Sequence, residues 1–197
     1  MIENIINSTI APWLSPQDQL QKAKKFAIGV ACYPAYFIVW ELSKKALFSI
    51  VENSIPVMEK MSLSGKILGG ISFGYRTIIV MPALEELLFR QVWQTKILNE
   101  TIKPLLPPSL SKRWDSWAGV AIRVSIVAPI FGLCHSPQLL RGDFKAETLA
   151  TFLGATLQGI AYGVLKEKVG FFASFGLHAT NNAHAFSLLA HHIFTKA

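Results

Sequence analysis

Residues 67–90 read ILGGISFGYRTIIVMPALEELLFR, an apolar run that ends in two adjacent carboxylates and an arginine. Its first eighteen residues, 67–84, are nearly long enough to cross a bilayer and almost wholly apolar. A helix that served only to bury itself in lipid would avoid Glu85, Glu86 and Arg90. Ionisable groups at membrane depth are costly, and they usually mark a site. The stretch therefore predicts a membrane helix that carries chemistry.

The composition of the whole chain also indicates a membrane protein. Of its 197 residues, 51% are hydrophobic and 16% are charged, whereas soluble domains carry roughly 25% charged residues. The net charge is +7, but the basic residues are spread over connecting segments and form no patch. This distribution argues against nucleic-acid binding and favours contact with membrane lipid head groups.

The apolar segments predict an all-α fold, a polytopic membrane bundle of about five to six helices with a polar active site inside the bundle. The predicted spans are residues 26–42, 67–84, 117–134, 148–165 and 169–194. Residues 46–61 are amphipathic and are predicted to lie at the interface or to cap the bundle. The proline-rich part of the polar region 91–116 is predicted to form an interfacial loop. We expect an N-terminal segment, 1–66, with one span and the amphipathic helix, followed by a core, 67–197.

The first polar island consists of Glu85, Glu86 and Arg90. Pro82 is suited to start or kink a helix, which would put both glutamates in a first turn, where the helix dipole favours negative charge. Glu86 and Arg90 are four residues apart and can pair, whereas Glu85 points about 100° away. A carboxylate without a counter-charge in an apolar pocket suits a general base. The alternative is a capping and salt-bridge pair at an interfacial helix start.

Two further islands lie in later apolar segments. FGLCH puts Phe131 and His135 on one helix face, and HATNN does the same for His178 and Asn182. Taken alone, the first fits a histidine at a helix end, and the second fits polar side chains that pin membrane helices together. Together, the three islands supply a carboxylate base, two histidines and an amide donor. That set suits hydrolysis by activated water with a stabilised oxyanion.

The ordered motifs EELLFR, FGLCH and HATNN resemble those of the CAAX prenyl protease type II and bacteriocin-processing (CPBP, or Abi) family of metal-independent intramembrane proteases. The family pattern is Glu-Glu-x-x-x-Arg, then Phe-x-x-x-His, then His-x-x-x-Asn, each on a membrane helix. The resemblance covers about residues 67–194. It implies an intramembrane endopeptidase without a cofactor, whose substrate is a membrane-associated peptide or protein, prenylated or leader-bearing.

The same resemblance implies a role for each catalytic residue. Glu85 would act as the general base and would position and deprotonate the attacking water together with His135. His178 and Asn182 would stabilise the tetrahedral oxyanion.

Three supporting residues follow from the resemblance as well. Glu86 and Arg90 would hold the first helix and orient Glu85, which agrees with the pairing that their spacing predicts. Phe131 would shape the pocket. The small size of the chain and the absence of targeting signals indicate a multi-pass protein of the bacterial inner membrane.

Other classes of function stay open on the sequence. Two histidines and a glutamate could bind zinc with one open position, although no HExxH-type spacing supports a zinc-dependent membrane protease. A non-catalytic immunity or scaffold protein would not need the complete motif set. A transporter would line a path with such residues, but no pseudo-repeat is visible. A cysteine protease built on Cys134 is disfavoured, because Cys134 and His135 are neighbours that point about 100° apart on a helix.

Overall fold

The structure, a computed structural model, describes residues 19–36 and 62–195, and every secondary-structure element in these ranges is helical. The predicted all-α fold is therefore confirmed. Three helices are long and apolar enough to cross a membrane, namely Ile67–Leu105, Trp117–His135 and Ala146–Lys168. They contain three of the five predicted spans. The fifth predicted span, 169–194, is helical from residue 171 onward but is not among the three. Part of 26–42 and all of the amphipathic segment 46–61 lie outside the described residues.

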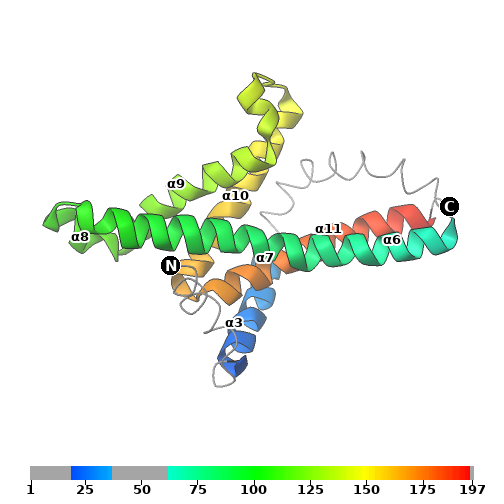
Figure 1. Ribbon diagram of the computed structural model, residues 1–197, viewed down its shortest axis with the longest axis horizontal. Helices are drawn as coiled ribbons and strands as arrows, with labels where there is room; N and C mark the ends of the chain where they lie inside the picture. Colours follow the sequence, from blue (N-terminus) through cyan, green and yellow to red (C-terminus); the bar gives the residue numbers. More distant parts are fainter. Residues whose placement is uncertain (1–18, 37–61, 196–197) are drawn as a thin grey trace, which may run out of the picture.

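One continuous helix runs from residue 63 to residue 105 and forms the long rod in Figure 1. Its successive segments are α6 (Leu63–Tyr75), η2 (Arg76–Val80), α7 (Met81–Glu86), η3 (Leu87–Ile102) and η4 (Lys103–Leu105). The segments η2 and η3 are π-helices, whose wide turns are closed by i→i−5 hydrogen bonds, as from Met81 N–H to Arg76 O. At 1.5 Å per residue the part of the rod from Ile67 to Leu105 spans about 50–60 Å, nearly twice the thickness of a bilayer core.

The structure corrects two expectations. The proline-rich segment that is predicted to be an interfacial loop forms a 3-10 turn, Lys103–Leu105, and a short helix, α8 (Pro108–Trp114), while residues 91–102 continue the rod. Pro82 lies inside the rod and starts no new helix, since the residues on both sides of it keep helical dihedral angles. Glu85 and Glu86 are therefore not in a first turn, and no helix dipole at their end stabilises their charges.

The helices α9 (Trp117–His135) and α10 (Ala146–Lys168) form an antiparallel hairpin that projects from the rod in Figure 1. A short 3-10 turn, η5 (Pro137–Arg141), joins them and ends at Gly142, whose φ of 82° is left-handed. The Ser-Pro pair after His135 ends α9, as its sequence predicts. A Cβ on Gly132 would lie 2.8 Å from the carbonyl oxygen of Phe152, so the glycine is what allows the two helices to touch.

The last helix, α11 (Phe171–Thr195), contacts the rod along α6, η2 and α7. The N-terminal helix α3 (Gln19–Ala31) packs mainly against α11. Gly29 makes this crossing close, because a Cβ there would overlap the backbone of Ala173. The three-way meeting of the rod, the α9–α10 hairpin and α11 forms the centre of the molecule.

The structure buries ionisable side chains and exposes large apolar ones, two features that are uncommon in a soluble protein. Glu86, Arg90 and Gln94 are fully buried, while Leu68 is 70% exposed and Leu84 56% exposed. Exposed apolar side chains continue along the rod, α9 and α10. Such surfaces are stable in lipid and unstable in water, whereas buried ionisable groups survive at membrane depth only when paired.

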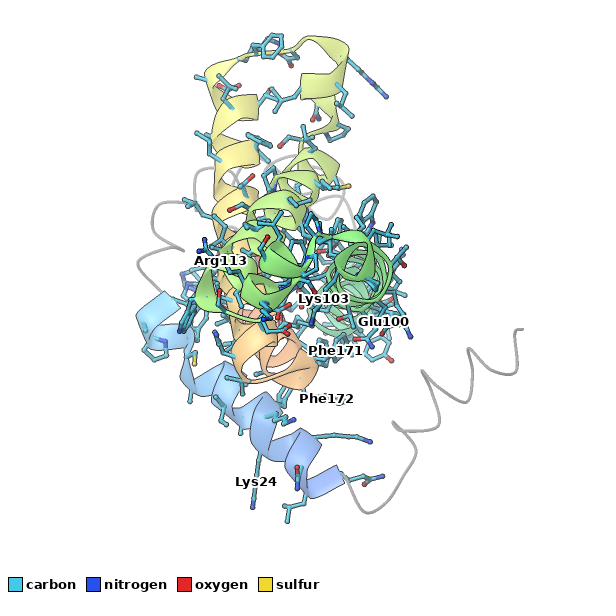
Figure 2. The ribbon with its side chains drawn as sticks, turned by 90° about the vertical axis from the view of Figure 1, so that its left-hand side faces the viewer. Lys24, Glu100, Lys103, Arg113, Phe171 and Phe172 are labelled. Atoms are coloured by element: carbon cyan, nitrogen blue, oxygen red, sulfur yellow. The ribbon has the colours of Figure 1, made fainter. Side chains whose placement is uncertain are left out.

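Basic and aromatic side chains gather where α8 (Pro108–Trp114) caps the rod. Figure 2 looks onto this side and shows Lys103 and Arg113 there. The ammonium of Lys168 lies 3.5 Å from the centre of the Trp117 ring. Lysine and tryptophan at the ends of apolar helices are typical of a membrane–water interface.

Candidate active site

The three polar islands meet around one oxygen of Glu85. The carboxylate Oε2 of Glu85 lies 3.6 Å from Nε2 of His135 on α9 and 3.5 Å from Nε2 of His178 on α11. This oxygen is buried and has no hydrogen-bond partner in the part of the chain that the structure describes. The side chain as a whole keeps 20% exposure. Three helices thus direct three polar atoms to a single point.

The backbone fixes the proton on His135. Its Nδ1 lies 2.9 Å from the carbonyl oxygen of Phe131, four residues earlier in α9. Since a carbonyl oxygen only accepts, Nδ1 carries the hydrogen and donates it. In the neutral ring, Nε2 is then an acceptor, and it faces Glu85, which is also an acceptor. Two acceptors 3.6 Å apart can share one donor that lies beside them and hydrogen-bonds to both.

Glu86 is held by three partners in a site that excludes solvent. Arg90 Nε lies 3.5 Å from one of its oxygens, and both side chains have 0% exposure. His178 Nδ1 lies 3.1 Å from the other oxygen. The hydroxyl of Ser174 donates to the carboxylate as well. His178 therefore stands between the two glutamates, with one ring nitrogen toward each.

Arg90 also attaches the rod to α10. Its Nη2 donates to the carbonyl oxygen of Gly159 at 3.0 Å, and Gln94, one turn further, donates to that of Gly163 at 3.2 Å. Gln94 donates in addition to Glu167, at 2.8 Å. These contacts repeat every four residues on both helices. This series of hydrogen bonds fixes the position of the rod, and therefore of Glu86, along the axis of α10.

Aromatic rings enclose the two histidines. The Phe131 ring is 1% exposed, and its centre lies 4.3 Å from that of His135. The Tyr162 ring stacks on His178 with centres 4.4 Å apart and planes 17° apart. Tyr36, from the N-terminal segment, stacks in turn on Tyr162 at 5.9 Å. The aromatic rings thus pack against the two imidazole rings, each of which faces a carboxylate through a ring nitrogen.

Asn182 lies one turn beyond His178 on the same face of α11. Its side-chain Nδ2 donates to the backbone carbonyl oxygen of Thr77 at 2.9 Å. The structure thus brings six of the seven predicted residues to the acid–histidine cluster or against its rings, and it places Asn182 beside the rod two turns before Glu85.

Four residues of this centre are missing from the sequence prediction, namely Ser174, Tyr162, Gln94 and Tyr36. Two of them left a signal. Ser174 precedes His178 by four residues, as Asn182 follows it by four, and Gln94 continues the four-residue spacing of Glu86 and Arg90. Nothing in the sequence separates the two tyrosines from ordinary core aromatics.

Among the side chains that the structure describes, no three from His, Cys, Asp or Glu form a group that could hold a metal ion. Cys134, the alternative nucleophile, is an exposed residue of α9.

The fold and the site define an α-helical membrane protein with a paired-glutamate and histidine centre inside its bundle. The model of one family, type II CAAX prenyl endopeptidase Rce1-like, matches residues 67–184, and the chain belongs to this family. The resemblance inferred from the motifs is thus confirmed, and the family is one of intramembrane CAAX-type proteases. No curated protein and no solved structure matches the chain.

Proposed function

We propose that this protein is an endopeptidase that hydrolyses a peptide bond of a membrane-associated substrate inside the bundle. The convergence of Glu85, His135 and His178 on one buried point, in a chain of this family, is the observation that carries the proposal. A water at that point would donate one hydrogen to Glu85 and one to His135, the two acceptors that face each other. A water oxygen placed to one side of two polar atoms that are 3.5–3.6 Å apart can lie at a hydrogen-bond distance of about 2.7–3.0 Å from both.

The proposed reaction begins with general-base catalysis. Glu85 takes a proton from the water, the water oxygen bonds to the scissile carbonyl carbon, and the carbonyl electron pair moves to its oxygen. The C–N bond then breaks as the carbonyl re-forms, and Glu85 returns the proton to the leaving nitrogen. His135 holds the water through its second hydrogen. General-base catalysis of this kind contributes about 10²–10⁴-fold to a rate.

His178 is the proposed donor to the oxyanion. The centre contains two carboxylates, Glu85 and Glu86, and one permanent cation, Arg90. A proton on His178 would balance the second carboxylate in an apolar site, where an uncompensated charge is costly. The ring would then donate from Nδ1 to Glu86 and from Nε2 toward the developing oxyanion. Preorganised donors of this kind are worth about 10²–10³-fold each.

The family and the exposed apolar surface of the helices support a substrate that is associated with the membrane. We propose a peptide or protein that reaches the site from the bilayer, with a prenylated C-terminus as the first substrate to test. We place the protein as multi-pass in the bacterial inner membrane, with lipids as its surroundings.

The test is cleavage of membrane-anchored peptides, prenylated and unprenylated, by the purified protein in lipid. Glu85→Gln and His135→Ala are compared with Glu100→Gln, a matched control on the same rod whose carboxylate is 53% exposed and pairs with Lys96. We expect the first two variants to lose at least about a hundredfold in kcat/KM and the control to keep full activity.

A strong chelator separates the mechanisms. Cleavage that survives the chelator and vanishes in Glu85→Gln supports water activated by glutamate. Cleavage that the chelator abolishes and zinc restores would make the protein a metalloprotease. Equal behaviour of the folded Glu85→Gln variant and the wild type would refute the catalytic role and favour an immunity or scaffold protein.

A further inference from the structure

Pro82 leaves one carbonyl of the rod without a donor. In the wide turn η2, the N–H of Met81 donates to the carbonyl of Arg76, five residues earlier. The carbonyl of Thr77 thus loses its α-helical donor, Met81. The next donor in the wide register is residue 82, which is proline and has no N–H. Thr77 O therefore has neither of the donors that its own helix would supply.

Asn182 provides the missing donor from another helix. Its Nδ2 lies 2.9 Å from Thr77 O, which is the length of an ordinary backbone hydrogen bond. At membrane depth a freed carbonyl finds no water, and proline is tolerated in such helices because neighbouring helices pair the freed group. Pro82 thus explains why a side chain that can donate a hydrogen bond stands at position 182, although the two residues are far apart in sequence.

The same bond sets the position of α11 along the rod. Ser174, His178, Asn182 and Phe186 follow each other at four-residue spacing on one face of α11. Each contacts the rod, the first two at Glu86, the third at Thr77 and the fourth at the Phe73 ring. Among the first three, Asn182 alone bonds to the backbone of the rod, which no side-chain rotation can move. A slip of one residue shifts a helix by about 1.5 Å and would carry His178 away from one or both glutamates.

We propose that Asn182 is a positioning residue that replaces the hydrogen-bond donor missing at Pro82 and thereby keeps His178 between Glu85 and Glu86. The inference rests on the proposed function for its catalytic consequence. It differs from an oxyanion role for Asn182, in which the amide contacts the substrate and Pro82 is irrelevant.

A double-mutant cycle on thermal unfolding tests the pairing without any substrate. Asn182→Leu, Pro82→Ala and the double variant are melted in the same detergent as the wild type. In the wild-type background we expect Asn182→Leu to lower Tm by several degrees. In the Pro82→Ala background we expect at least half of that loss to disappear. The alanine restores an N–H at position 82, and this group, or the N–H of Met81 if the turn relaxes to an α-helix, then pairs with Thr77 O. Asn182→Ala replaces the leucine variant if the latter does not fold.

A matched control lies on the same helix. Thr180→Val removes a side-chain hydrogen bond that is local to α11, from Thr180 to Gly176 O, and its effect on Tm should be the same in both backgrounds. Equal losses for Asn182→Leu in both backgrounds, or no loss in either, would overturn the proposal.

Kinetics on a cleaved peptide supply the second readout. We expect Asn182→Leu to lower kcat at least about tenfold with little change in KM, since a 1 Å misplacement in an active site can cost about 10²-fold. In the double variant, Pro82→Ala should raise kcat at least about twofold above that of Asn182→Leu alone. An oxyanion donor gives a different result, since restoring a backbone N–H cannot replace a group that contacts the substrate. If no peptide is cleaved, the proposed function fails while the thermal cycle still decides the role of Asn182.

Discussion

Replacing Arg90 with methionine tests whether the buried ion pair holds the acidic centre together. Arg90 and Glu86 are both at 0% exposure and 3.5 Å apart, so the substitution leaves a buried carboxylate without its permanent counter-charge. Breaking one side of a buried pair costs about 3–5 kcal/mol. Because Glu86 keeps His178 and Ser174 as partners, we expect the lower end, about 3 kcal/mol. For a chain of this size that corresponds to a fall in Tm of about 6–12 °C.

The assay is thermal unfolding of the purified protein in one detergent, with Glu86→Gln and the double variant completing a cycle. In the Glu86→Gln background the carboxylate that Arg90 pairs with is absent, and the cost of Arg90→Met should fall by about 2 kcal/mol. A cost below about 1 kcal/mol in the native background, or the same cost in both backgrounds, would refute the ion-pair reasoning. What persists in the double variant measures the bond from Arg90 to Gly159 O and the packing of the side chain on Phe131.

Three further outcomes follow from the packing. Gly132→Ala should destabilise by about 1–3 kcal/mol, because the new methyl meets the backbone of α10, whereas Gly70→Ala, with open space around it, should be neutral or stabilising; melts of both variants check this. Glu167→Gln leaves Arg123, 2.7 Å away and nearly buried, without a counter-charge; we expect a lower Tm with an unchanged pH profile of cleavage, and a displaced profile would contradict a purely structural role. Ser174→Ala should cost about 1.5–3 kcal/mol through the lost hydrogen bond to a charged group, and an unchanged melt would argue against that bond.

The helical class and the motif residues could be predicted from local sequence. Apolar runs of membrane length, interrupted by Glu85–Arg90, by His135 and by His178–Asn182, determine where helices form and which positions are too costly to be incidental. The four-residue spacing of Glu86 and Arg90 predicts their pairing, because it is a property of one helix. The Ser-Pro pair after His135 likewise ends its helix by a local effect.

The errors arose where a local signal was overridden by packing. Pro82 predicted the start or a kink of a helix with both glutamates in its first turn, yet the rod continues through it, and a donor from α11 pairs with the carbonyl of Thr77 that is left without a helical donor. The proline-rich part of the region 91–116 predicted a loop, yet it folds into a 3-10 turn and the short helix α8. Residues 91–102 before it continue the rod, with Gln94 and Leu98 buried at the four-residue spacing of Glu86 and Arg90.

By itself the sequence determined that the chain is an all-helical membrane protein of this protease family, and which polar residues its helices carry, since hydropathy and motif spacing are properties of single segments. Tertiary structure decided which atoms of those residues face each other. His178 lies between two glutamates, Tyr162 covers its ring, and Asn182 bonds to Thr77 rather than to either acid. These contacts depend on the rotation and height of α9, α10 and α11 against the rod. Close approach at glycines and hydrogen bonds across helices fix both, and no single segment encodes either.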